Sequence, residues 1–517
     1  MTKFTCCSIA ATTLLLLTCV SGQAQTPDDA LRSSWFIPRG SARSMAIGGA
    51  MGSLGGDISA ASVNPAGIGL YKTKEIVFTP GFVFNSVKSN FRDSTTKSSK
   101  TGFAYGPIGF VLGNPEGRRN GWTSSAFALT VTQLASYNNQ VSYAGYNNYS
   151  SFSEQYVEEL AGDNADSYAA ENNYINGSSL AFRTYLVDTL NNSSGAQIGY
   201  KTLVPFASGI YQQYNAVTRG GFHEINLAFA GNKSDRFYIG GSLGIPIVSY
   251  HRELFYQETD ATGNTNNDFN SFQYREKFTS SGIGLNAKLG VIYKPTDYFR
   301  LGFAFHTPSL ISFKDQLRAS ITTDLENYTG YRVFTETSDN LNSGKAVERN
   351  YNQLTPYRFI VSGSYVFREA ANTRRQRAFI TADIEYINHR GSRYSTSEDD
   401  NPGLKAYYKA VNEATKGYLK NAFNFRVGGE IKFAPWMIRL GAAYYGSPYQ
   451  DKKLKANRMM TSGGIGYRNR GIFIDVTYAY MFNKDVDFPY RLNDAANTFS
   501  SLNNNRGNLI MTIGFKI

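Results

Sequence analysis

Apolar and polar residues alternate along much of this chain with a repeat of two. In the last segment Leu509, Met511, Ile513, Phe515 and Ile517 fall on one face of an extended chain, and the residues between them fall on the other. Because successive side chains of a β-strand point to opposite faces, this repeat predicts strands. Such windows cover residues 75–85, 102–112, 122–135, 218–231, 236–251, 273–293, 299–314, 355–367, 378–389, 422–433, 436–446, 460–469, 472–483 and 507–517.

The connections between these windows alternate between short and long. Tight ones, such as Asn232–Asp235 and Arg470–Gly471, carry turn residues, whereas the longest, 136–219, is polar and rich in Asn, Ser and Tyr. Within it, Ser151 and Glu154 form a capping-box pair that predicts a helix start. An even strand number brings both ends of a single-chain barrel to one side. We predict an all-β fold, a transmembrane antiparallel β-barrel of about 14 strands with long extracellular loops; a large soluble β-sandwich is the alternative.

Composition fits an outer membrane barrel. The 36 tyrosines and 35 phenylalanines suit the two interfaces of a membrane, where amphipathic rings concentrate. The net charge of +12 suits attraction to anionic lipid head groups, and no nucleic-acid motif is present. We therefore expect a multi-pass barrel in the outer membrane of a Gram-negative cell.

The N-terminus predicts a secretory signal peptide over residues 1–24. Lys3 precedes an apolar core, and Gly22, Gln23 and Ala24 provide a small-residue cleavage site. All three cysteines lie within this segment, so the mature chain would carry no thiol. A lipoprotein signal ending at Cys19 is the alternative, although Thr18 fits it poorly.

Charged residues occupy the polar faces of the strands, where a lipid environment would cost about 2 to 4 kcal/mol for each Arg or Lys near the midplane. We expect them to point into the lumen. They are Glu224, Lys288, Arg300, Arg358, Asp383, Glu385, Arg426, Glu430, Lys432, Arg439 and Asp475. Arg426 and Arg439 are candidate contacts for a ligand carboxylate, and a salt bridge to Glu430 or Asp475 is the alternative for either.

The segment before the first strand is small and glycine-rich, with too little bulk for a core of its own. Residues 43–71 read RSMAIGGAMGSLGGDISAASVNPAGIGLY. Glycine and alanine let backbones approach closely, so we predict that residues 25–73 form a plug, or hatch, inside a barrel of residues 74–517. A loose periplasmic leader is the alternative, in which Asn64 and Pro65 would form only a turn.

These motifs resemble the FadL/TodX family of outer membrane transporters of hydrophobic compounds. The N-terminal ones are Gly48–Ala50, Asp57, Ser59–Ala60 and Asn64–Gly67, and the resemblance continues at 282–309, 355–367, 425–448 and 462–468. It covers most of the mature chain except the loops. Turns and loops are similar to those of Bacteroidetes-type members.

The resemblance implies passive uptake of hydrophobic molecules, typically long-chain fatty acids. Extracellular loops would capture the ligand, Asn64, Pro65, Ala66 and Gly67 would belong to a gating hatch, and a break in the wall would release ligand sideways. The implied partners are a fatty acid-like molecule, outer membrane lipids, lipopolysaccharide and the barrel assembly machinery, without a cofactor. The closing aromatic Phe515 resembles the signal that this machinery reads.

Four other functions are weighed against uptake of fatty acids. A FadL-like barrel can serve as the outer membrane component of a protein secretion system, and related channels take up aromatic hydrocarbons or haem. For haem, His306 is the one candidate axial ligand. Gly240–Gly244 matches G-x-S-x-G, but Ser242 is predicted to lie in mid-strand rather than at a strand-to-helix turn. We therefore predict that the protein is not an enzyme.

Overall fold

The computed structural model describes residues 27–116, 121–326, 328–330, 332–367, 377–398, 401–452, 454 and 456–517. The predicted signal peptide lies outside these residues. Among them, no helix is long and apolar enough to cross a membrane.

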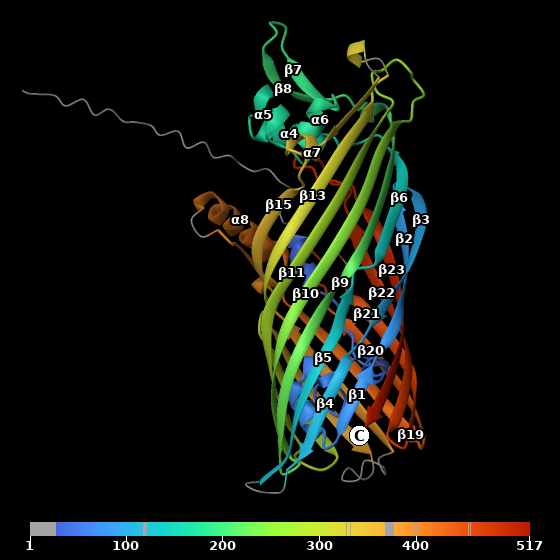
Figure 1. The fold of residues 1–517 in the computed structure, drawn as a ribbon. Helices are drawn as coiled ribbons and strands as arrows, with labels where there is room; N and C mark the ends of the chain where they lie inside the picture. Colours follow the sequence, from blue (N-terminus) through green and yellow to red (C-terminus); the bar gives the residue numbers. More distant parts are fainter. Residues whose placement is uncertain are drawn as a thin grey trace, which may run out of the picture.

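Antiparallel strands form one closed sheet (Figure 1). The strands of the wall are β1 (Lys74–Phe78), β2 (Pro80–Phe91), β3 (Ser94–Tyr105), β4 (Ile108–Pro115), β5 (Trp122–Ser136), β6 (Asn139–Asn147), β9 (Ile210–Lys233), β10 (Phe237–Asp260), β11 (Ser271–Tyr293), β12 (Phe299–His306), β13 (Leu310–Asp324), β15 (Val347–Leu354), β16 (Arg358–Phe367), β17 (Ala378–Ile387), β18 (Arg393–Thr396), β19 (Ala422–Phe433), β20 (Trp436–Tyr445), β21 (Arg458–Asn469), β22 (Ile472–Asp487) and β23 (Ser500–Lys516). The last strand, β23, pairs with both β1 and β2 and closes the barrel.

Six of the barrel strands are interrupted, namely β1/β2, β3/β4, β5/β6, β12/β13, β15/β16 and β17/β18. With each pair taken as one strand, the barrel has fourteen, and each predicted window falls on one of them. The predicted fold class is confirmed.

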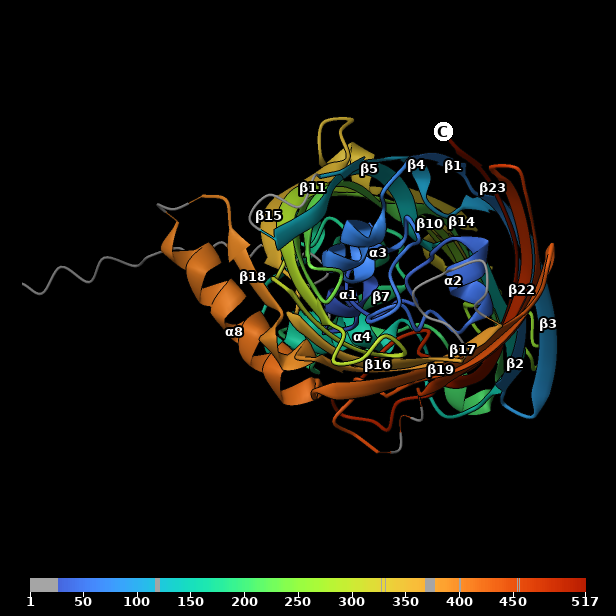
Figure 2. The same ribbon diagram turned by 90° about the horizontal axis from the view of Figure 1, so that it is seen from below.

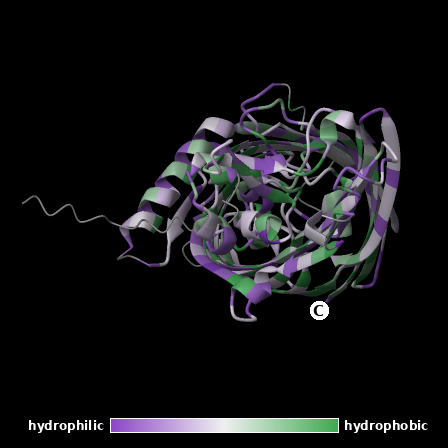
Figure 3. Ribbon diagram, turned by 90° about the horizontal axis from the view of Figure 1, so that it is seen from above, coloured by the Kyte–Doolittle hydropathy of each residue, from purple (hydrophilic) through white to green (hydrophobic). Residues whose placement is uncertain are grey.

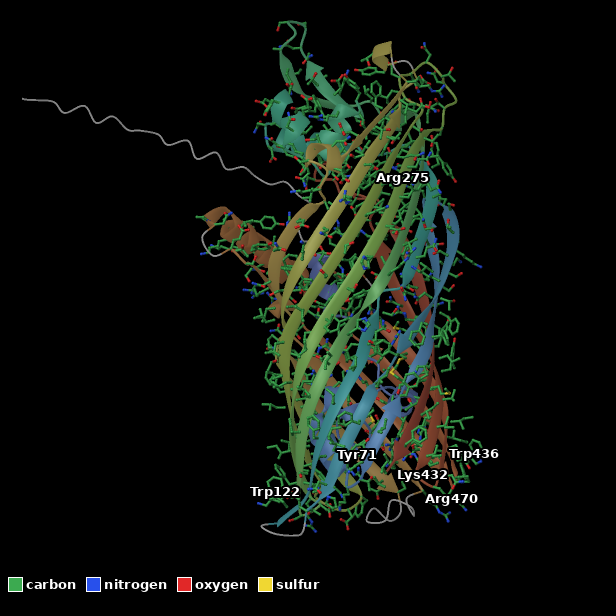
Figure 4. The ribbon with its side chains drawn as sticks, viewed as in Figure 1. Tyr71, Trp122, Arg275, Lys432, Trp436 and Arg470 are labelled. Atoms are coloured by element: carbon green, nitrogen blue, oxygen red, sulfur yellow. The ribbon has the colours of Figure 1, made fainter. Side chains whose placement is uncertain are left out.

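The outward face of the barrel carries an apolar band. Leu440 is 70% exposed on this face, whereas the neighbouring Arg439 is 1% exposed and points inward. Trp122 and Trp436 lie near the lower end, where the short turns and the C-terminus are found (Figure 4). Arg275 lies on the upper part, above the band. This arrangement is that of a membrane-spanning barrel with its short turns toward the periplasm.

Above the band, strands, helices and loops build an ordered cap, where the sequence predicted a long extracellular loop with one helix over 136–219. Its elements are α4 (Glu154–Gly162), α5 (Ser167–Asn172), α6 (Ser178–Arg183), β7 (Val187–Asn191), β8 (Gln197–Thr202), η3 (Phe206–Ser208), η4 (Tyr328–Gly330), β14 (Val333–Thr337) and α7 (Ser338–Leu341). Buried aromatic rings, among them Phe152, Tyr256 and Phe272, hold it on the extended strands.

The helix predicted from the capping-box pair is present as α4, but only half of the box forms. The Glu154 carboxylate accepts a hydrogen bond from the Ser151 N–H at 2.7 Å. Ser153, not Ser151, precedes the helix, and the Ser151 hydroxyl donates to Glu258 instead. A buried carboxylate from β10 therefore takes the hydroxyl that the helix end would otherwise use.

The N-terminal segment lies inside the barrel, where Figure 2 shows its helices within the ring of strands. Its elements are α1 (Pro27–Arg32), α2 (Ala42–Ala46), α3 (Ala60–Val63) and η1 (Pro65–Leu70). Met45, Ile47, Met51 and Ile68 are at most 2% exposed. One further helix, α8 (Pro402–Tyr418), follows η5 (His389–Gly391) and lies outside the wall, as seen from above in Figure 3.

Candidate functional site

Asn64 joins the hatch to the barrel wall. It caps η1, where its Oδ1 accepts from the Ala66 N–H at 3.2 Å. Its Nδ2 donates to the Gly52 carbonyl at 2.6 Å and lies 3.3 and 3.4 Å from the carbonyl oxygens of Val291 and Phe303 on β11 and β12. One amide thus organises the hatch internally and docks it to two strands.

Pro65, Ala66 and Gly67 belong to the same contact. All three are buried in η1, and a Cβ added to Gly240 of the wall would lie 2.6 Å from the Pro65 carbonyl carbon. A Cβ at Gly290 would overlap the Asn64 amide oxygen. The hatch can therefore touch the backbone of the wall at these glycines, because a residue with a side chain would block the contact.

Arg426 and Arg439 face the lumen as predicted, and both guanidinium groups lie in ion pairs. Arg439 contacts Glu430 and Asp475, each at 2.6 Å, and its side chain is fully enclosed. Arg426 pairs with Glu385 and also lines a small cavity beside the hatch. Their roles as ligand contacts stay predictions. The contacts that the structure shows are ion pairs with carboxylates of the lumen wall.

Three other arginines line a cavity of about 230 Å³ above the hatch and have carbonyl or amide partners instead of acids. We call Arg39, Arg458 and Arg506 the arginine cluster. None of them forms an ion pair with any residue that the structure describes. A fourth arginine at this cavity, Arg32, pairs with Asp29.

Each member of the cluster is held in place by neutral groups. Arg39 donates to Gln133 Oε1 at 2.9 Å and to Asn508 Oδ1 at 3.3 Å. Arg506 donates to Asn85 Oδ1 and to the Ser136 carbonyl, both at 2.8 Å. Arg458 donates to the Trp35 carbonyl at 3.0 Å, and its guanidinium lies 3.4 Å from the Trp35 ring centroid.

The rest of this cavity is mostly apolar. Its lining includes Trp35, Phe36, Ile37, Met45, Met460 and Met481. Burial, together with the nearby Arg506 guanidinium, lowers the pKa of Arg39 to about 9. No carboxylate contributes to this shift, so no neighbouring negative charge compensates the burial of Arg39.

Beside the cavity the barrel wall has a seam. β3 forms a ladder only with β2, and β6 only with β9, so among the described residues no backbone ladder joins β3 to β6. Side chains bridge the seam: Lys100 Nζ donates to the Thr218 carbonyl and Ser98 Oγ to the Gln140 carbonyl, each at 2.8 Å.

The seam begins where β5 ends, and the cavity lies directly behind it. Ala135, Ser136 and Tyr137 line the cavity. Gln133 accepts from Arg39 on the inside and, at 3.4 Å, from the Tyr105 N–H at the end of β3. The arginine cluster, the apolar part of the cavity and the seam, where no backbone ladder joins the strands, are therefore neighbours in the structure.

Two minor candidates from the sequence are also located. Ser242 lies within β10, 5% exposed and paired in register with Lys288 and Ala228, so no strand-to-helix turn surrounds it. The Nε2 atom of His306 lies 2.8 Å from the Val63 carbonyl of the hatch. That nitrogen is thus engaged by the hatch backbone.

Sequence reasoning missed the arginine cluster. Arg39 lies hundreds of residues before the other two, and Arg458 and Arg506 fall just before the predicted windows 460–469 and 507–517. Only the folded chain reveals which arginines form no ion pair with a described residue. The aromatic pair Trp35–Phe36 shortly before Arg39 was the one sequence signal nearby.

No protein-family profile and no curated protein matches the sequence. Solved structures with the same fold include a FadL homologue from Pseudomonas aeruginosa, at 13% identity and a TM-score of 0.56 over 93% of this chain and 99% of that one. The Pseudomonas putida toluene transporter TodX aligns at 12% identity and a TM-score of 0.50 over 93% and 99%. The chain therefore has the fold of the FadL and TodX outer membrane β-barrels, with a hatch inside the lumen.

Proposed function

We propose that the protein takes up hydrophobic molecules passively across the outer membrane, and that its preferred ligands are long-chain fatty acids. The proposal rests on one observation: three arginines without acidic partners line an apolar chamber behind a seam in the wall. The shared fold with FadL and TodX channels is consistent with uptake of hydrophobic compounds.

A fatty acid matches the chamber in both of its parts. Its carboxylate would accept charge-assisted hydrogen bonds from the cluster, each contributing about 1.5 to 3 kcal/mol. Its alkyl chain would contact Trp35, Met460 and Met481, where burial contributes about 0.8 kcal/mol per CH₂. A neutral aromatic hydrocarbon would gain only the free energy of apolar burial and would leave the arginine cations without a negative partner.

Above the chamber a wider cavity of about 440 Å³ lies under the cap. Aromatic rings and charged groups line it, including Phe152, Tyr274 and the ion pair of Arg252 with Glu276. This vestibule is where we propose that extracellular ligand is captured. Displacement of the hatch below would then connect the chamber to the seam.

Fluorescence of Trp35 provides the test. The chain has three tryptophans, and Trp122 and Trp436 lie on the lower outer rim, so the W122F/W436F background leaves Trp35 as the only reporter. Dibromostearate should quench it at concentrations at least tenfold lower than dibromostearyl alcohol, because only the acid meets the cluster. Equal quenching by both probes would refute the fatty acid assignment and favour neutral hydrocarbons.

The matched variants are Arg39→Met with Arg506→Met, against Arg275→Met. The first pair removes two chamber cations and should abolish the preference for the acid. Arg275 is exposed on the outer surface of β11, so its replacement should leave quenching unchanged. A secretion role would instead appear as a stoichiometric protein copurifying with the barrel, and haem binding as a Soret shift that is lost in a His306→Ala variant.

A further inference from the structure

Helix α8 lies outside the barrel at the upper border of the apolar band. Figure 2 shows it along its length, across the barrel axis and next to the outer surface of the wall. β19 begins at Ala422, shortly after the helix ends, and Phe423 is the uppermost apolar residue on its outward face, 53% exposed. Because Phe423 faces lipid, α8 is at the level of the head groups of the outer leaflet.

The helix is fixed to the wall rather than suspended from it. Tyr408, Val411 and Thr415 are buried. Asn412 covers the free edge of β18: its Oδ1 accepts from the Tyr394 N–H at 2.7 Å, and its Nδ2 donates to the Tyr394 carbonyl at 2.8 Å. The side chain thus takes the place of a neighbouring strand and holds α8 in one position.

A groove of about 440 Å³ runs between α8 and β18, and its charge is strongly positive. Lys405, Lys409 and Lys416 lie three or four residues apart or in multiples of that spacing, so they form one stripe on the helix, and Arg393 faces them from β18. Glu413 is the one carboxylate among the lining residues. We call this site the basic groove.

The four cations of the basic groove form no ion pair with any residue in the described part of the chain. Some exposed cations elsewhere on this barrel are paired, as Lys314 is with Glu348 at 2.9 Å and Arg318 with Asp339. Four unpaired cations around one carboxylate leave a net charge that attracts an anion of two charges or more.

We propose that the basic groove binds the phosphate group of a phosphorylated lipid in the outer leaflet. A phosphate monoester carries the matching charge and accepts hydrogen bonds from several ammonium groups and from the planar fork of Arg393. The acyl chains of such a lipid would lie against the apolar band below Phe423. The site acts independently of the transported ligand, and its occupant anchors the barrel and its cap to the membrane surface.

The experiment uses the full-length protein in nanodiscs of phosphatidylcholine doped with lipid A, and counts retained lipid by native mass spectrometry. The test variant replaces Lys405, Lys409 and Lys416 with Gln. The matched control replaces Lys201, Lys233 and Lys345, which are exposed and lie away from α8, with Gln. Surface cations contribute about 1 kcal/mol each, so the test variant should bind lipid A on the order of 100-fold more weakly, and the control should match the wild type.

Two further measurements keep the result interpretable. Lipid A without its phosphates should be retained no better by the wild type than by the test variant; equal retention of both lipids by the wild type would overturn phosphate recognition. Replacement of the three lysines with Arg should restore binding, since charge is kept. Unchanged binding of lipid A in the Gln variant would place its contacts elsewhere and refute the site, and displacement by millimolar inorganic phosphate alone would indicate a soluble anion instead of a lipid.

Discussion

Replacement of Asn64 with Ala tests whether the hatch is held by the contacts described above. The substitution removes the Nδ2 donor to the Gly52 carbonyl at 2.6 Å and the longer contacts with the carbonyls of β11 and β12. It also removes the cap of η1. A lost cap costs about 1 kcal/mol and a buried carbonyl left without a donor about 1 to 3 kcal/mol.

The docked hatch should therefore lose about 2 to 4 kcal/mol relative to a displaced one, which corresponds to roughly a 30- to 1,000-fold shift in that equilibrium. Hydrogen exchange of peptides within residues 52–71 measures it directly. The N–H groups of Gly56 and Tyr71 donate to carbonyls within this region and should exchange faster by that factor.

The matched control is Asn147→Ala. Asn147 is equally buried, and its Nδ2 also has three partners, Ser150, Gln212 and Tyr490, but all of them lie in the cap region. Exchange should then rise in the cap and stay unchanged in the hatch. If the Asn64→Ala hatch exchanges at the wild-type rate, the amide does not hold it. Replacement of Asn64, Pro65 and Ala66 together should also reduce uptake of labelled oleate at normal surface abundance.

Two further predictions concern the wall. A Cβ at Gly102 would lie 3.3 Å from Asn138 Cβ across the seam, close to disulfide geometry, so Gly102→Cys with Asn138→Cys should crosslink in a mature chain predicted to lack other thiols. Oxidation should stop oleate uptake and leave Trp35 quenching intact, and reductant should restore uptake; uptake through the oxidised barrel would exclude the seam as the exit. Arg439→Met should lower stability by about 3 to 5 kcal/mol, because Glu430 and Asp475 are then buried without a cation. Urea unfolding in vesicles measures this loss, and a change in fatty acid affinity without loss of stability would instead support the predicted ligand contact.

The sequence predicted the strands well only where lipid imposes the pattern. The window 422–433 coincides with β19, because every outward residue there meets the apolar band. β9 begins at Ile210 rather than at 218, since its upper outward residues, such as Gln213 and Asn215, are polar, whereas the residues between them, such as Tyr214 and Ala216, are buried against the cap. Above the membrane the outward face of a strand no longer meets lipid, so the pattern of apolar outward residues ends although the hydrogen-bonded ladder continues.

Some functional residues could likewise be predicted from the sequence, and others could not. Asn64 was predicted because it belongs to a compact motif, and the structure places it at the contact between hatch and wall. Arg39, Arg458 and Arg506 could not be predicted, because what distinguishes them is the lack of an ion-paired acidic neighbour among the residues that the structure describes. The two arginines chosen from the sequence, Arg426 and Arg439, have such neighbours on adjacent strands.

The distribution of charge inside the barrel bears on the direction in which a ligand leaves. Arg439 lies near the lower end of β20 with Glu430 and Asp475, so a direct path to the periplasm passes buried ion pairs. An alkyl chain entering there would separate charges from their partners, at several kcal/mol per ion, and gain no apolar contact. The lower end of the seam between β3 and β6 lies beside the exposed Phe103 at the upper edge of the apolar band, and each methylene that enters lipid there would regain about 0.8 kcal/mol. The neutral carbonyl and amide partners of the arginine cluster hold its cations without competing for a carboxylate, so the head group can bind at the seam while the chain enters the bilayer. If the proposed uptake of fatty acids is correct, the ion pairs at the lower end of the lumen and their absence around the arginine cluster favour lateral release over a direct path to the periplasm.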